Sequence, residues 1–402
     1  MNYKFKIRPS REKYIAFCQA LCIFNVLIDY LVSLLFRIIG IPSDNLRVIT
    51  YIIYIFLAIS ALLIRGKFRV RSLLLPVFLV IALIVSMNVN PDIDKYSNFY
   101  ESMLFICLPV YILYKSYFNI ELVTKYAIFI SYFSCVFFGL VFFIHFLVTP
   151  ILKSANYQTT SYALLLPFII LAQKKGKKPI DFILLSWVGI LSVLAGGRIS
   201  IFCLGLYFAV LIIKRGSKNI LYGIVMIIPT LVILWNFDSI LELIAKLCNS
   251  LGIKGGIAYY SGIGNVYLDS TRTVIYDECL TLIAQKPFIG YGLLGDRLVL
   301  NYAYSHNVFL EVAMQFGIII SALLALWIIY KIIRVLLSER KNGTDLILFR
   351  GLFYTTGFVV LLFSNSYLNQ PCFFAFLAML SISDQYNSNT IIWGRKKFKW
   401  MN

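Results

Sequence analysis

Charged residues are scarce in this chain. Only 14% of its 402 residues are Asp, Glu, Lys or Arg, against about a quarter in an ordinary soluble domain. Hydrophobic residues make up 60%, and the mean hydropathy is +0.83. One water-soluble core cannot bury that much apolar side chain. Repeated apolar stretches of about 20 residues would suit a bilayer, whose hydrocarbon core is roughly 30 Å thick.

Metal-site patterns are absent as well. The chain has two histidines and eight cysteines, and no CxxC or other ligand spacing links them. We therefore expect no metal site. Six cysteines lie in apolar stretches, where they pack as small hydrophobic side chains. The other two, Cys248 and Cys279, fall in the longest polar segment, and whether they form a disulfide stays open.

The chain has a formal net charge of +19, but the position of this charge argues against a nucleic-acid partner. Lysines and arginines form short clusters between apolar stretches, which is how membrane topology is encoded. All of these clusters fall on one side, and the alternate loops are neutral or acidic. Because basic loops stay in the cytoplasm, we predict that both termini are cytoplasmic. The clusters lie near residues 4–13, 65–71, 174–178, 214–218, 331–341 and 395–399.

These patterns predict an all-α membrane protein, because lipid offers no partner to an unpaired backbone N–H or C=O group. We expect about twelve transmembrane helices: nine within residues 1–235, and three more, with a cytoplasmic tail, within 304–402. Their expected positions are 15–39, 48–64, 72–88, 101–118, 126–148, 160–173, 180–196, 198–213, 219–235, 313–334, 346–365 and 371–383.

The segment 236–303 is too long for a simple connection and lies on the extracytoplasmic side of the predicted topology. It is close to neutral, and it contains apolar residues at helical spacing near 240–247 and 274–283. Loops of this length usually carry a function. We expect an extracytoplasmic loop with short amphipathic helices that lie at the membrane surface.

Gly197 and Arg198 form a very short outer turn before an apolar helix. Arg198 could simply anchor the helix end by reaching to the interface. However, an outward arginine opposes the positive-inside bias, and a helix N-terminus already carries partial positive charge. The pair therefore favours an anion.

Arg272 is placed in the first turn of a second outer helix, with Ser270 or Thr271 as its N-cap. The same argument predicts an anion site here. The alternative is an ion pair of Arg272 with Asp269 or Asp277.

His306 stands at the outer surface, where residues from Val308 onward begin a helical pattern. Histidine exchanges protons near neutral pH, so His306 is a candidate general base. The other histidine, His145, lies in an apolar stretch and is expected to be buried. Asn307 follows His306 directly, and Glu311 either pairs with an arginine or lines the cavity.

Tyr291 lies among Gly290, Gly292 and Gly295, after Pro287. This turn lacks the strand–turn–helix setting of a nucleotide loop, and a tight turn is the favoured interpretation. Tyr291 is nevertheless included among the candidate substrate contacts. Two arginines, three helix starts and one histidine on one face together suggest a pocket for a phosphorylated, lipid-linked substrate.

These residues resemble the bacterial O-antigen polymerase and O-antigen ligase family. The resemblance covers roughly residues 190–320 and is carried by GGRIS at Arg198, TRTVIYDECLTLIAQKPFIGYG from Thr271, and YSHNVFLEVAMQFG around His306. The order of the three motifs is fairly specific. This chain has GGR where many members have Ser-Arg-Gly, which keeps the arginine but changes its turn.

The resemblance implies an inverting glycosyltransferase in the bacterial cytoplasmic (inner) membrane that acts on undecaprenyl-diphosphate-linked oligosaccharides outside the cytoplasm. No metal or nucleotide sugar is implied. Arg198 and Arg272 would hold the donor diphosphate, and His306 would be the base for the acceptor hydroxyl. Beside what the resemblance implies, we expect Asn307, Glu311, Gly197 and Tyr291 to contact the substrate. A flippase and a chain-length regulator are expected partners.

Three functions remain open. We favour a polymerase of repeat units for O-antigen, capsule or another exopolysaccharide, because no acceptor site for the lipid A core of lipopolysaccharide is evident. A ligase would transfer the finished glycan to that core. A transporter or flippase of the same lipid-linked sugar is less favoured, since transporters place binding charges at the bilayer midplane.

Overall fold

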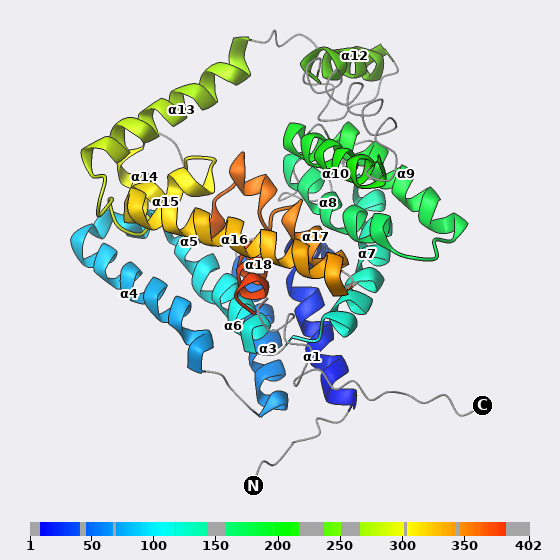
Figure 1. Ribbon diagram of the computed structural model, residues 1–402, viewed down its shortest axis with the longest axis horizontal. Coiled ribbons are helices and arrows are strands. Elements are labelled where there is room, and N and C mark those ends of the chain that lie inside the picture. Colours follow the sequence, from blue (N-terminus) through cyan, green and yellow to red (C-terminus); the bar gives the residue numbers. More distant parts are fainter. Residues whose placement is uncertain are drawn as a thin grey trace.

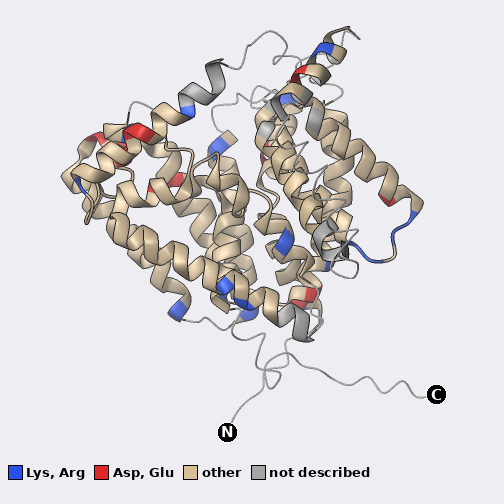
Figure 2. Ribbon diagram, turned by 45° about the horizontal axis from the view of Figure 1, so that its top comes forward, with Lys and Arg blue, Asp and Glu red and all other residues tan. Residues whose placement is uncertain are grey.

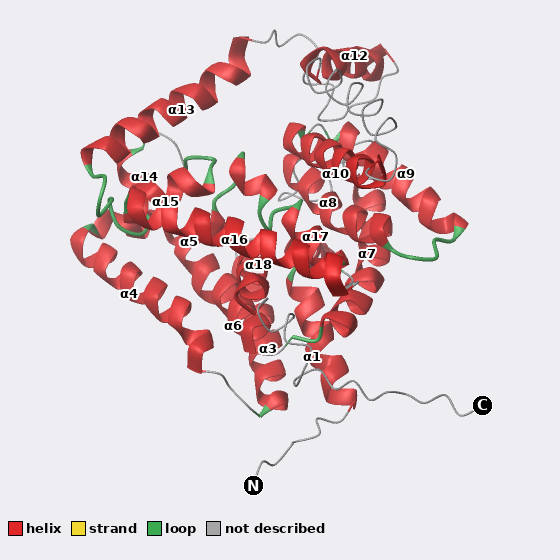
Figure 3. Cartoon of the chain, viewed as in Figure 1, coloured by secondary structure: helices red, strands yellow, loops and turns green. Residues whose placement is uncertain are grey.

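Helices form all of the regular structure in the described part of the chain, and this part contains no strand (Figure 3). The computed structural model describes residues 9–40, 46–66, 70–116, 118–142, 157–195, 197–216, 237–250, 266–300, 304–342 and 346–382. The prediction of an all-α fold is therefore confirmed for these residues.

The first half of the chain supplies the larger share of the helices, which run in order along the blue-to-green part of Figure 1. They are α1 (Pro9–Cys22), α2 (Asn25–Ile39), α3 (Leu46–Arg65), α4 (Leu74–Val89), α5 (Ser97–Ser102), α6 (Leu108–Ser116), α7 (Ile120–Phe142), α8 (Tyr157–Gln173), α9 (Pro179–Leu194) and α10 (Arg198–Gly216). Short turns of other helix types join some of them: η2 (Val70–Leu73), η3 (Pro91–Tyr96) and the π-helical η4 (Met103–Cys107).

The second half contains the long polar segment and further apolar helices. Its elements are α12 (Phe237–Ser250), α13 (Val266–Gln285), α14 (Asp296–Val299), α15 (Val308–Phe316), α16 (Ile318–Asn342), α17 (Ile347–Phe353), η7 (Val359–Leu362), η8 (Tyr367–Asn369) and α18 (Pro371–Ile382). Helix α18 is central: every residue except Ser381 is buried, and it packs against α6.

Four helical stretches are long and apolar enough to cross a membrane, among the residues that the structure describes: 46–65, 70–89, 120–142 and 318–337. They expose many large apolar side chains, such as Leu63, Leu323 and Leu326, which suits contact with lipid. The chain is therefore an integral membrane protein. The predicted count of about twelve spans is not confirmed, and the predicted span 219–235 lies outside the described residues.

The predicted span 15–39 is in fact two helices, α1 and α2, which meet at an angle of 83°. A break inside a membrane protein frees backbone carbonyls that need new donors. Tyr54 Oη donates to the Cys22 carbonyl (3.1 Å), and Cys372 Sγ donates to the Ile23 carbonyl (3.1 Å). The bend is thus held by side chains far away in sequence, which periodicity alone does not reveal.

The predicted spans 313–334 and 346–365 are also interrupted. Gly317 separates α15 from α16 with φ +86°, a value that ends a helix and that side chains with a Cβ rarely adopt. Beyond α17, residues 354–370 form turns and short 3₁₀ segments instead of a helix. Hydropathy shows neither break, because both regions remain apolar in sequence.

Helices α12 and α13 lie at the top edge of the molecule, and α1 and α3 reach the opposite edge (Figure 1). The top edge carries acidic and basic residues together, whereas the lower part carries mostly Lys and Arg (Figure 2). This distribution suits the predicted orientation, which stays a prediction. The predicted division of the chain at 235/236 and 303/304 also stays a prediction, because both boundaries fall at undescribed residues.

The junction of α15 and α16 packs closely on the turn after α13. A Cβ added to Gly317 would lie 2.2 Å from the Phe288 carbonyl oxygen, and one added to Gly290 would lie 2.6 Å from the Gln315 carbonyl carbon. The Ile318 N–H donates to the Pro287 carbonyl oxygen (2.7 Å). The two backbones touch directly, so α13 and α16 are rigidly joined at this end.

Gly317→Ala should therefore destabilise the protein by about 2–4 kcal/mol, since it combines a backbone clash with an unfavourable φ. The measurement is the thermal unfolding of the detergent-purified variant. Gly205→Ala is the control, because a Cβ at Gly205 meets no atom within 4 Å. Equal melting temperatures for the two variants would contradict the expected clash.

Candidate functional site

His306 occupies an unusual backbone conformation at the start of α15. Its φ is +58°, in the left-handed region that costs a non-glycine residue about 1–3 kcal/mol. The residues on either side hold this turn. Asn307 is the N-cap of α15, and its Oδ1 accepts from the N–H groups of Phe309 (2.9 Å) and Leu310 (3.2 Å). The sequence correctly predicted this helix start.

The imidazole of His306 is half-buried and packs against the ring of Tyr304, with a centroid distance of 4.3 Å. Burial and the positive charge of Arg272 lower the pKa of His306 to about 4. The turn lies outside the membrane-spanning stretches. His306 is therefore neutral at neutral pH, and its buried Nδ1 has no hydrogen-bond partner within the described part of the chain.

Arg272 lies on α13 and is half-buried, but the expected start of that helix is wrong. The helix begins at Val266, not at Ser270 or Thr271, so Arg272 lies in the second turn and not beside the N-terminus. Serine and threonine cost little inside a helix, and the chain simply continues through them. Arg272 therefore does not gain from the helix dipole as predicted.

The suggested ion pair of Arg272 with Asp277 is not seen, and none of the ion pairs between described residues involves Arg272. The side chain of Asp269 lies outside the described residues. The charge of Arg272 acts instead on His306, on Tyr276 in the same helix and on Tyr162 in α8. The structure thus brings two of the three predicted catalytic residues together.

Helix α10 begins at Arg198, as the sequence predicted. The side chain of Arg198 lies outside the described residues, but its neighbour Gly197 is buried. A Cβ on Gly197 would lie 2.4 Å from Ser161 Oγ. Glycine therefore lets the N-terminus of α10 approach α8 next to Tyr162, the residue that Arg272 influences.

Tyr162, which sequence reasoning missed, lies beside the candidate site. Gln158 Nε2 donates to Tyr162 Oη (2.8 Å) and to Ser364 Oγ (3.4 Å). Gln158 and Tyr162 are four residues apart, so they lie on one face of α8. Two polar side chains at this spacing in an apolar helix are a signal that could have identified them.

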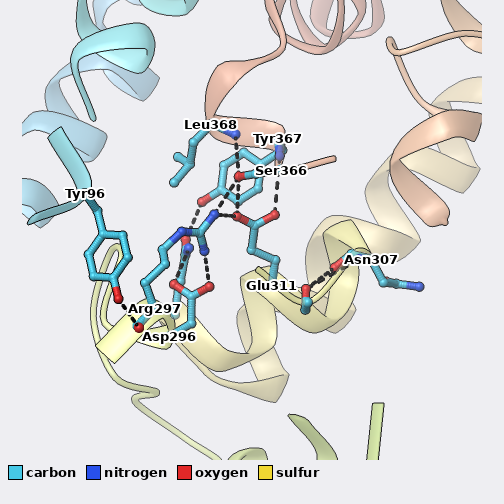
Figure 4. A network of polar contacts seen from close by, with 10 residues as sticks. Tyr96, Asp296, Arg297, Asn307, Glu311, Ser366, Tyr367 and Leu368 are labelled. Atoms are coloured by element: carbon cyan, nitrogen blue, oxygen red, sulfur yellow. Dashed lines mark hydrogen bonds and ion pairs between the residues drawn. The ribbon is translucent and has the colours of Figure 1, made fainter. Parts of the chain in front are cut away.

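Glu311 lies in a buried polar network that also contains Arg297, another residue that sequence analysis did not single out (Figure 4). Arg297 Nη2 donates to Glu311 Oε1 (2.5 Å) and to Ser366 Oγ (2.7 Å), and its Nη1 pairs with Asp296. Of the two roles expected for Glu311, the structure shows an ion pair with an arginine. The arginine is neither Arg198 nor Arg272.

Tyr291 joins α13 to α15. Its hydroxyl donates to the Leu282 carbonyl (3.1 Å), and its backbone N–H donates to the Met314 carbonyl (2.7 Å). Gly290 and Gly292 have positive φ, which agrees with the expected tight turn. These contacts give Tyr291 a packing role, and its assignment to substrate binding stays a prediction.

Two further predictions concern metal ions and disulfides. No group of three or more His, Cys, Asp or Glu side chains could hold a metal ion within the ranges that the structure describes. Cys279 is buried with a free thiol, and the side chain of Cys248 lies outside the described residues.

The region that contains these residues is similar to known glycan transferases. Residues 180–327 match the family described as O-antigen ligase. A relative, the ComP-specific O-oligosaccharyltransferase of Acinetobacter baylyi (strain ATCC 33305 / BD413 / ADP1), is 31% identical over 102 residues. That alignment covers 22% of this chain and 18% of the relative, so it spans less than a fifth of the relative's length. No solved structure matches the chain.

The matched segment contains Arg198, Arg272 and His306. It also contains the three charged residues of the buried network: Asp296 and Arg297 on α14, and Glu311 on α15. The resemblance inferred from the motifs is thus confirmed: residues 180–327 of this integral membrane protein match the O-antigen ligase family.

Proposed function

We propose that the protein polymerises undecaprenyl-diphosphate-linked oligosaccharide repeat units on the extracytoplasmic face of the bacterial inner membrane. The observation that carries this proposal is the neutral imidazole of His306, held in a strained turn next to the charge of Arg272. A neutral base beside a cation suits a reaction in which a hydroxyl loses a proton and an anionic group leaves. The family match supports glycan transfer from a lipid carrier in general.

In the proposed reaction, Arg272 and Arg198 hold the donor diphosphate, and His306 takes the proton of the acceptor hydroxyl. The acceptor oxygen forms a bond to the anomeric carbon on the face opposite the phosphate. The bond between that carbon and the phosphate oxygen breaks, and its electron pair leaves with the undecaprenyl diphosphate. The anomeric configuration is inverted, and the arginines stabilise the charge that develops on the leaving group.

The neighbouring arginine links donor binding to the strength of the base. In the free protein, burial and the Arg272 charge lower the pKa of His306 to about 4. A diphosphate bound to Arg272 brings negative charge beside the imidazole and raises the pKa of His306. The base therefore becomes stronger when the donor is present, closer to the working pH where proton transfer is most effective.

This coupling predicts two different pH profiles. As pH falls, kcat/KM should decline with the free-enzyme pKa of about 4, whereas kcat should decline at a higher pH. The measurement is steady-state transfer between pH 3.5 and 8, with lipid-linked repeat units extracted from a deletion strain as substrate. Identical acid limbs for kcat and kcat/KM would show that donor binding does not change the base.

A ligase is the second candidate, and the description of the matching family favours it. The similar protein from Acinetobacter baylyi is named an oligosaccharyltransferase, which also transfers a glycan to a separate acceptor. Polymerase and ligase use the same donor diphosphate and the same base. They differ only in the acceptor, so the residues of the site support both.

The deciding experiment is glycan analysis of a deletion strain complemented with the wild-type gene or with His306→Ala. Single repeat units on the surface acceptor, in both the deletion and the mutant, would support the polymerase. Long polymer that stays on undecaprenyl diphosphate would identify a ligase. Repeat units that stay on the cytoplasmic face would support a flippase and would refute the proposed site.

A further inference from the structure

Three charged side chains lie together without access to solvent: Asp296 (0% exposed), Arg297 (1%) and Glu311 (0%). The Arg297 guanidinium contacts both carboxylates (Figure 4). It also lies over the Phe99 ring at 4.6 Å. The proposed reaction uses none of these charges directly. Their burial therefore calls for a separate explanation.

Stability alone is a poor explanation for such a network. Burial raises the pKa of Asp296 and of Glu311, and the charge of Arg297 opposes that rise. Apolar side chains of the same volume often stabilise a core at least as well as buried ion pairs. What the ion pairs provide is directional geometry, because each hydrogen bond fixes a particular atom of a particular segment.

The hydrogen bonds of the network join four segments of the chain: η3, α14, α15 and residues 366–367. Tyr96 Oη donates to the Arg297 carbonyl (2.7 Å), which attaches α14 to η3. Ser366 Oγ donates to Glu311 Oε1 (2.5 Å) and the Tyr367 N–H donates to Glu311 Oε2 (3.3 Å), which attach α15 to the turn before η8. The carboxylate of Glu311 is thus enclosed on both oxygens.

The same network sets the position of the turn that contains His306. The Glu311 N–H donates to the Asn307 carbonyl (2.9 Å), so Glu311 closes the first turn of α15. Asn307 Nδ2 donates to the Leu362 carbonyl (3.0 Å). The turn is therefore pinned to residues 362–367 at two points, one directly after His306 and one a helical turn later.

We infer that Arg297 and Glu311 are positioning residues for His306. Their ion pair fixes the first turn of α15 against residues 362–367, and this fixed turn holds His306 in the left-handed conformation beside Arg272. Ser364, in the same segment, accepts a hydrogen bond from Gln158, which also contacts Tyr162. The segment 362–367 thus aligns the base with the wall of the site formed by α8.

This inference rests on the proposed role of His306, and two conservative variants test it. Glu311→Gln keeps the side-chain volume but removes the charge. Arg297→Lys keeps the charge but loses the planar fork that contacts both carboxylates. For each, kcat per folded protein should fall about 10- to 100-fold, because a displaced catalytic group loses about that much rate. The KM for lipid-linked repeat units extracted from a deletion strain should stay within threefold, since Arg272 is unchanged.

The control is Asp181→Asn, which removes a carboxylate from an ion pair with Lys174 (2.9 Å) at the opposite end of α8 from Tyr162. It should lose stability but keep its kcat. A kcat within twofold of wild type for both Glu311→Gln and Arg297→Lys would overturn the positioning role. A loss of kcat/KM that comes from a higher KM would also overturn it, as would an equal loss of kcat in Asp181→Asn. Full activity of His306→Ala would instead refute the proposed function itself.

Discussion

Replacement of His306 with alanine is expected to slow glycan transfer by about 100- to 10,000-fold, the range that a general base contributes. The imidazole is neutral in the free protein because burial and the charge of Arg272 lower its pKa to about 4. Alanine leaves no group there to take the acceptor proton. The measurement is the transfer rate of detergent-purified protein with lipid-linked repeat units, and KM for the donor should change little.

The matched control for this variant is His145→Ala, because His145 is the other histidine of the chain and the sequence places it in an apolar stretch. It should keep nearly all of its transfer rate. If His306→Ala retains more than a fifth of the wild-type rate, His306 is not the base. If only His145→Ala is inactive, the transporter alternative gains support.

Arg272→Ala should reduce kcat about 100- to 1,000-fold, comparable to the loss of one donor that stabilises developing negative charge. Arg272→Lys should recover only part of this loss, because an ammonium group keeps the charge but not the bidentate contact with phosphate oxygens. The structure supports this role, since no described carboxylate pairs with Arg272. The measurement is kcat and KM for the lipid-linked donor.

The alanine variant should also change the titration of His306. Arg272 lowers the pKa of His306, so its removal raises that pKa, while burial still holds it below the usual value. The acid limb of kcat/KM should therefore move to higher pH in Arg272→Ala. Lys286→Ala is the control, because Lys286 is a cation just past the far end of α13 and lies over Tyr291. An unchanged acid limb of kcat/KM in Arg272→Ala would show that the charge of Arg272 does not act on His306.

Local sequence signals predicted the parts of the site that depend on local structure. The helical pattern from Val308 onward placed His306 just before a helix, and in the structure Asn307 is the N-cap of that helix. Gly197 and Arg198 likewise marked the start of α10. The start of α13 was missed because Ser270 and Thr271 also occur inside helices, where their cost is small.

Contacts between distant segments were beyond prediction from one sequence. Arg297, in the stretch GDRLV, reads as an ordinary polar turn residue. Its partner Ser366 is 69 residues away, and Tyr96, which binds its carbonyl, is 201 residues away. The bend between α1 and α2 depends in the same way on Cys372, 349 residues from its acceptor. Hydropathy reports how apolar each segment is, but not which segments meet.

The backbone contact between Gly317 and the turn after α13 joins α13 rigidly to the membrane-spanning α16, so that α13 acts as a fixed arm of α16. Arg272 lies 13 residues before Gln285, the last residue of that arm, which at 1.5 Å per residue is about 20 Å. The level of the guanidinium relative to the bilayer is then set by how α16 sits in the lipid. A change in bilayer thickness that tilts α16 would shift Arg272 relative to the phosphate layer, which makes lipid composition a determinant of how well the arm meets its substrate.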